Sequence, residues 1–153
     1  MRKAFSTIQA IMIVLIVGGI ALLTLKFATI QSKHYADSYL KEQAELFLLS
    51  AVEATLMTIS GYERNETNGC VREVNVVSPD GKFEANVTIE RYFLYRGRDN
   101  YDENWPSRCD DLNVSIENRD SHGMILIRAV VENNANKLPN YHIRIVRRSI
   151  QWP

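Results

Sequence analysis

Charged residues are missing from the stretch between Phe5 and Leu25, FSTIQAIMIVLIVGGIALLTL, although they make up 24% of the whole chain. A helix over this stretch would be about 32 Å long, roughly the thickness of the hydrocarbon core of a bilayer. The run is too long for a secretory signal peptide, and the residues after it continue as helix. A chain of 153 residues also has no second layer large enough to bury such a rod. The stretch is therefore interpreted as a membrane-spanning helix.

Proline and glycine are also missing, over the whole range from Ile20 to Ser60. Apolar residues recur at helical spacing between Leu40 and Ile59, and the charged residues lie mostly away from that stripe. The stripe consists of Leu40, Ala44, Phe47, Leu48, Ala51, Thr55, Leu56 and Ile59. Gly61 follows its last member and is suited to end a helix. We therefore expect one helix of about 84 Å from about Phe5 to Ser60, apolar all round at first and on one face later.

The rest of the chain has the alternation of apolar and polar residues that is typical of strands. Five strands are expected, at residues 71–77, 82–95, 112–116, 124–132 and 141–150. The first two form a hairpin through the turn sequence Ser78-Pro79-Asp80-Gly81. In the second strand, the apolar face is expected to hold Phe83, Ala85, Val87, Ile89, Phe93 and Tyr95, with Arg91 as its single polar exception. The fold class is therefore α+β, with the outer half of the helix packed on an antiparallel sheet of four or five strands.

Motifs for catalysis, metal binding and nucleic-acid binding are not evident. His34, His122 and His142 are far apart, and none has another histidine or cysteine at metal-ligand spacing. Acidic residues in the loop between positions 99 and 111 are of the kind that binds calcium, but they lack regular ligand spacing. Lysine plus arginine equals aspartate plus glutamate, at 18 each, and no basic stripe is interleaved with aromatic residues. We therefore predict no enzymatic activity, no cofactor, no metal site and no nucleic-acid partner.

The orientation in the membrane follows from the position of the first basic residues. Arg2 and Lys3 precede the apolar run, so the N-terminus is expected in the cytoplasm and the head on the other side. Cys70 and Cys109 both lie in that exported part, where disulfides persist. Since the chain has no other cysteine, these two are expected to be joined.

The residues at the start of the apolar run form a specific pattern. The order Lys3-Ala4-Phe5-Ser6-Thr7-Ile8-Gln9, running into Met12-Ile13-Val14, resembles the type III signal of type IV pilins and type II secretion pseudopilins. In that family a short basic leader ends in glycine or, less often, alanine. Phenylalanine, a small hydroxyl pair, an aliphatic residue and glutamate follow. This chain departs from the pattern at Ala4 in place of glycine, at Gln9 in place of glutamate, and at Lys26 in place of a helix-kinking proline.

The resemblance implies a division of the chain into three parts. Residues 1–4 would be a leader peptide, residues 5–30 a transmembrane and assembly helix, and residues 31–153 a periplasmic, pilin-like head. A prepilin peptidase would cleave between Ala4 and Phe5, and the new amine of Phe5 would be methylated.

The resemblance also implies partners. These would be other pilin or pseudopilin subunits, the prepilin peptidase and an inner-membrane assembly platform. Gly18 and Gly19 would permit close approach of neighbouring helices, and Gln9 would occupy the position at which the family's glutamate acts in assembly. An alternative stays open, an unprocessed bitopic inner-membrane protein with a periplasmic binding domain.

Three N-x-S/T sequons begin at Asn65, Asn86 and Asn113. Each has an acidic residue two positions earlier, and this extended pattern looks like the acceptor of bacterial oligosaccharyltransferases. The strand alternation places Asn86 and Asn113 on the polar face, while Asn65 lies in a loop after the helix. At least partial glycosylation is expected at all three, with Asn65 the best acceptor.

Overall fold

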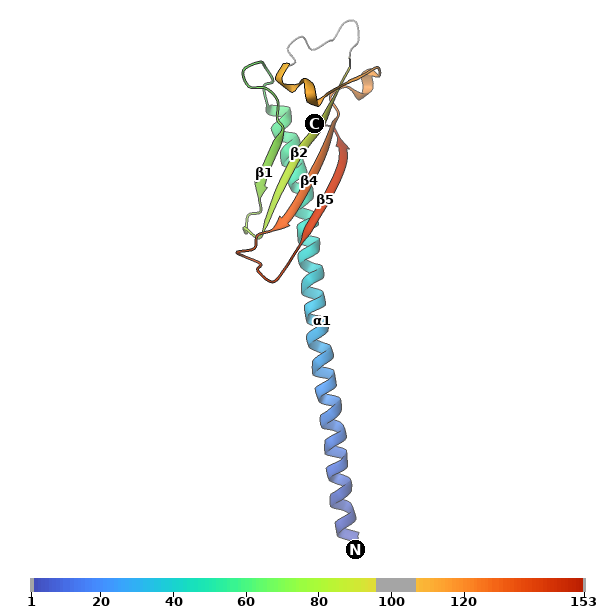
Figure 1. Ribbon diagram of the computed structural model, residues 1–153. Helices are drawn as coiled ribbons and strands as arrows, with labels where there is room; N and C mark the ends of the chain where they lie inside the picture. The colour runs from blue at the N-terminus through green and yellow to red at the C-terminus, as the bar shows by residue number, and fades with distance from the viewer. Residues whose placement is uncertain (1, 96–106, 153) are drawn as a thin grey trace. The chain divides into compact units, whose positions relative to one another are not determined.

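The computed structural model describes residues 2–95 and 107–152, with side chains described from residue 8 onward. The elements are one long helix, five strands and two short 3₁₀ helices (Figure 1). They are α1 (Arg2–Gly61), β1 (Glu73–Val77), β2 (Phe83–Tyr95), η1 (Ser107–Leu112), β3 (Asn113–Ile116), η2 (Arg119–Ser121), β4 (Ile125–Asn133) and β5 (Arg144–Gln151). The α+β fold class, with a long N-terminal helix packed on a sheet, is confirmed.

The chain divides into two compact units, Met1–Lys41 and Glu42–Pro153. The first unit contains the N-terminal part of α1. The second contains the last five turns of α1 and the whole sheet. The expected boundary between the transmembrane part and the head, at residue 31, stays a prediction.

The last turns of α1 supply one layer of the head's core. The predicted apolar stripe is confirmed there, since Ala44, Leu48, Ala51 and Ile59 are buried and Phe47 stacks on Phe83 of β2 with ring centroids 6.4 Å apart. Thr55 is the one polar member of that stripe and is fully buried. Its hydroxyl donates to the carbonyl of Ala51 at 2.8 Å, which spares the cost of an unsatisfied buried donor.

The sheet has the order β1-β2-β4-β5, and all three neighbouring pairs along it are antiparallel. Strand β3 departs from the expected antiparallel pairing, because it pairs parallel with the end of β2 from Tyr92 to Tyr95. On the same edge of β2, β1 pairs with Glu84 to Thr88. One edge of β2 therefore carries two short strands in succession.

Strand β2 contains a β-bulge that the alternation did not predict. Its register on β4 passes from Ile89 opposite Ile127 to Arg91 opposite Leu126, so Glu90 is an extra residue. Because an inserted residue exchanges the two faces of a strand, Tyr92 and Leu94 enter the core. The expectation that Phe93 and Tyr95 would fill these core positions is wrong, and Arg91 is exposed rather than an exception on the apolar face.

Tyr92 is the largest fully buried side chain among the described residues of the head. Its hydroxyl donates to the carbonyl oxygen of Val71 at 2.7 Å, just before β1. Burial raises the pKa of Tyr92 to about 12, so the hydroxyl remains a donor at any physiological pH.

Candidate functional site

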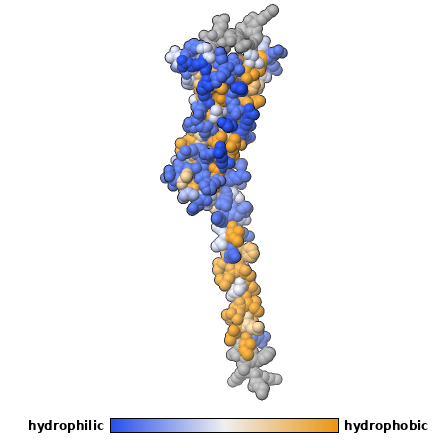
Figure 2. Space-filling model, viewed as in Figure 1, coloured by the Kyte–Doolittle hydropathy of each residue, from blue (hydrophilic) through white to orange (hydrophobic). Residues whose placement is uncertain are grey.

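Exposed apolar side chains recur throughout α1 from Ile8 to Ile30, and they dominate the face of it that Figure 2 shows. The large ones in this segment are each between 55% and 70% exposed within the chain. The helix is long and apolar enough to cross a membrane by its length and composition. A helix that is apolar all round is stable when lipid or other apolar helices surround it. We call Ile8–Ile30 the apolar segment.

Two hydroxyl groups within the apolar segment are satisfied by the helix itself. The hydroxyls of Thr24 and Thr29 donate to the carbonyls of Ala21 and Lys26, each at 2.8 Å, so neither needs a partner outside the helix. A Cβ atom added at Gly18 or at Gly19 would meet nothing within 4 Å. These two glycines thus leave the helix backbone open to close approach by a neighbouring helix.

The sequence-predicted processing residues lie at the start of this helix. Ala4 and Phe5 are in the first turns of α1, but their side chains lie outside the described ones. The side chain of Gln9 is exposed. Cleavage, methylation and the assembly role of Gln9 therefore stay predictions.

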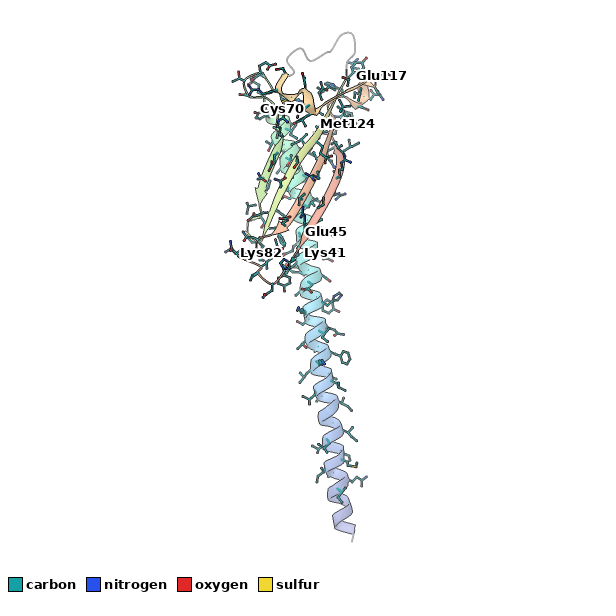
Figure 3. The ribbon with its side chains drawn as sticks, in the orientation of Figure 1. Lys41, Glu45, Cys70, Lys82, Glu117 and Met124 are labelled. Atoms are coloured by element: carbon teal, nitrogen blue, oxygen red, sulfur yellow. A yellow bond between two sulfur atoms is a disulfide. The ribbon has the colours of Figure 1, made fainter. Side chains whose placement is uncertain are left out.

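At the far end of α1, the predicted disulfide between Cys70 and Cys109 is confirmed. The Cα atoms are 6.2 Å apart, and Cys109 is only 1% exposed. Cys70, labelled in Figure 3, precedes β1, and Cys109 lies in η1, which leads into β3. The disulfide therefore joins the two connections that deliver β1 and β3 to the same edge of β2.

Polar contacts also join the same two connections, the segment before β1 and η1. The guanidinium of Arg72 donates to both carboxylate oxygens of Asp111 at 2.8 Å and to the carbonyl of Arg108 at 2.6 Å. The carboxylate of Glu66 accepts from the backbone N–H of Ser107 at 2.8 Å and from its hydroxyl at 3.1 Å. Arg72 holds the pKa of Asp111 below its usual value, chiefly through the hydrogen bond. We call these residues and the disulfide the disulfide clamp.

Sequence reasoning found only the cysteines of this clamp. Arg72 and Asp111 are 39 positions apart, and an isolated arginine and an isolated aspartate carry no local signal of pairing. The cysteines were found because the chain contains only two.

The structure places the three sequons in different surroundings. Asn65 is half-buried at the start of an exposed turn, and its Oδ1 accepts from the backbone N–H groups of Thr67 at 3.0 Å and Asn68 at 2.7 Å. Asn86 lies within β2, half-buried and between two core residues of the opposite face. Asn113 was expected on the polar face, but its Oδ1 is buried and has no hydrogen-bond partner among the described residues. In the parallel pair, Asn113 lies opposite Tyr92.

No cluster of three metal-ligating side chains is found in the described parts of the chain. His122 has a structural contact, since its Nδ1 accepts from the backbone N–H of Tyr95 at 3.0 Å. Of the acidic loop considered for calcium, Asp99, Asp102 and Glu103 lie outside the described residues, and only Asp110 and Asp111 are within η1.

No protein-family model, curated protein or solved structure matches this chain. The apolar segment and the residues before it are therefore the chief guide to function.

Proposed function

We propose that this chain is a minor pilin or pseudopilin, a structural subunit of a type IV pilus or type II secretion filament. The observation that supports this most strongly is the exposure of the apolar segment, directly after the junction Lys3-Ala4-Phe5. The exposed segment requires lipid or like helices around it. A generic membrane anchor would need the apolar segment but not the leader-like junction.

In this proposal the work of the chain is assembly. The apolar segment is held in the inner membrane as a single pass, with the head in the periplasm, until the prepilin peptidase removes residues 1–4. The assembly platform then extracts the helix, and packing against neighbouring subunits replaces its lipid contacts. Gly18 and Gly19 lie on the surface of the segment that these neighbours would contact.

The alternative is an unprocessed bitopic protein whose helix stays in the membrane. The departures from the family pattern at Ala4, Gln9 and Lys26 favour it, because each lies at a position that serves processing or packing in the family. The two functions differ in whether the chain enters a filament, so fractions of sheared filaments separate them.

We predict that Gln9 makes this a low-copy subunit at or near a filament tip. In the family, glutamate at this position pairs with the N-terminal amine of a neighbouring subunit. A hydrogen bond to a charged group contributes about 1.5–3 kcal/mol, against about 0.5–1.5 kcal/mol for a neutral one. Glutamine keeps the acceptor but loses the charge, and a filament of identical copies would repeat that weakness at every subunit.

The measurement is the number of copies of this chain relative to the main subunit in sheared filaments. Wild-type protein should be much rarer than the main subunit, and Gln9→Glu should increase its share. Gln31→Glu makes the same chemical change at an exposed position later in α1 and should leave the share unchanged. Equal copy numbers of wild-type chain and main subunit would contradict the tip position, and absence from the filaments would favour the bitopic alternative.

A further inference from the structure

We propose that Asn65 is the glycosylation site of the folded head, and that Asn86 and Asn113 accept glycan only while the chain is unfolded. The proposal requires an exported head but not assembly into a filament. An extended sequon offers three groups to a transferase: the acidic side chain two positions before, the Nδ2 of the asparagine, and the hydroxyl two positions after. The structure leaves these groups free at Asn65 and occupies all three at Asn86, whereas at Asn113 it holds the acidic side chain and pairs the backbone.

At Asn65 all three groups are available. Glu63 and Thr67 are exposed, and neither the carboxylate of Glu63 nor the hydroxyl of Thr67 forms a hydrogen bond or ion pair among the described residues. The Nδ2 of Asn65 donates no hydrogen bond there either, since the turn uses only its Oδ1. The middle residue Glu66 is tied to Ser107, but a sequon requires only that this residue not be proline.

At Asn86 all three groups are engaged. The carboxylate of Glu84 accepts from Asn134 Nδ2 at 2.8 Å, and the hydroxyl of Thr88 donates to Asn86 Oδ1 at 3.1 Å. The Nδ2 of Asn86 itself donates to Asn75 Oδ1 at 2.9 Å and to a carboxylate of β1. The backbone of this sequon is paired on both sides, with β1 and with β4. A transferase would therefore have to open the middle of the sheet to reach Asn86.

The third sequon is engaged at one of its three groups, and its backbone is paired with β2. The carboxylate of Asp111 is held by both nitrogens of Arg72, within the disulfide clamp. The Oδ1 of Asn113 is buried, and its backbone begins the parallel pair with β2. Asp111 and Ser115 are exposed, whereas Asn113 is half-buried. Access to Asn113 thus requires loss of both the clamp and the β2–β3 pair.

The transfer itself balances with one co-reactant, an oligosaccharide linked to a polyprenyl pyrophosphate. A bond forms between Asn65 Nδ2 and the anomeric carbon of the first sugar, and the bond from that carbon to the pyrophosphate oxygen breaks. The lipid pyrophosphate leaves with the electron pair, and Nδ2 loses one proton to a base of the transferase or to solvent. The turn around Asn65 is held by its own Oδ1 and by bonds of Glu66 and Thr67 to Ser107 and Arg108 in η1, so it can open without breaking a strand pair.

The test compares folded and unfolded chain as acceptors. Full-length protein with its disulfide intact is incubated in detergent with a purified bacterial oligosaccharyltransferase and its lipid-linked oligosaccharide. A second sample is first reduced, alkylated and kept unfolded. A short acceptor peptide in both reactions shows that the enzyme is active, and mass spectrometry of glycopeptides measures occupancy at each asparagine.

In the folded chain, occupancy at Asn65 should exceed that at Asn86 or Asn113 by about tenfold or more, because only those two require subglobal opening. In the unfolded chain all three should be occupied. Glu63→Gln should lower occupancy at Asn65 in the folded chain without altering the fold. Glu53→Gln, a matched change at another exposed position without a side-chain partner, should have no effect.

Two results would overturn the proposal. Equal occupancy of Asn65 and either other asparagine in the folded chain would show that the contacts described do not control access. A bare Asn65 in the folded chain, with the acceptor peptide glycosylated, would show that it is not an acceptor there. Neither result bears on filament assembly, so failure of this proposal and failure of the proposed function are distinguishable.

Discussion

Aspartates placed together at Val14 and Val17 should release the chain from the membrane. These side chains lie in the middle of the apolar segment and are 69% and 59% exposed within the chain. If lipid surrounds them, each carboxylate costs about 2.5–3.5 kcal/mol at the helix centre, or about 5–7 kcal/mol for the pair. The measurement is the share of protein that resists extraction of membranes with alkaline carbonate, which should fall from nearly all to a minor fraction.

The same helix offers a matched control at Leu46 and Leu49. These leucines have the same spacing and are 68% and 45% exposed, but they lie in the head. Two aspartates there would meet water and should leave membrane retention unchanged. Both pairs of side chains are exposed within the chain, so only lipid around Val14 and Val17 would make their replacement more costly. Equal membrane retention of the two double variants would therefore contradict a membrane position for the apolar segment.

Replacing both cysteines of the clamp by alanine should lower the free energy of unfolding of the head by about 4 kcal/mol. Cys70 and Cys109 are 39 positions apart, and the chain-entropy model assigns about this value to closing a loop of that length. Small domains are stable by about 5–15 kcal/mol in total, so the loss would be a large part of the head's stability. Urea unfolding followed by near-ultraviolet circular dichroism, which reports the packing of Tyr92, measures the change.

Reductant provides the control for this experiment. Reduced wild-type protein should lose as much stability as the double variant, and reductant should not affect the variant further. Unfolding of the variant within about 1 kcal/mol of the oxidised wild type would contradict a stabilising role for the disulfide. It would also indicate that the polar contacts of the clamp hold the two connections together without the disulfide. That would be a larger contribution to stability than an exposed ion pair such as Arg72–Asp111 usually makes.

The sequence predicted most of the fold because its signals are local. The absence of proline and glycine before Gly61 located the end of α1 to within one residue, and alternation located all five strands. The bulge at Glu90 was missed because its one local sign, Arg91 on the predicted apolar face, was interpreted as an exception, and pairing with β4 was needed to reveal it. The parallel direction of β3 was missed because alternation locates a strand but does not give its partner or its direction.

The candidate sites also differ in how far the sequence alone could predict them. The apolar segment and the disulfide were predicted because hydrophobic length and the number of cysteines can be read directly from the sequence. The three sequons look equivalent in the sequence, and only contacts with Asn134 and Arg72 distinguish them. Asn134 directly follows β4 and Arg72 directly precedes β1. Both are distant in sequence from the sequons they contact, so no spacing within a sequon could have revealed them.

The most direct test of the proposed function is the N-terminal residue and mass of the protein purified from cells with an active prepilin peptidase. The proposal predicts a chain that lacks residues 1–4 and begins with N-methylated Phe5, while the same cells without the peptidase should retain Met1. A mature protein that still begins with Met1 in the presence of the active peptidase would contradict the proposal and favour an unprocessed membrane anchor.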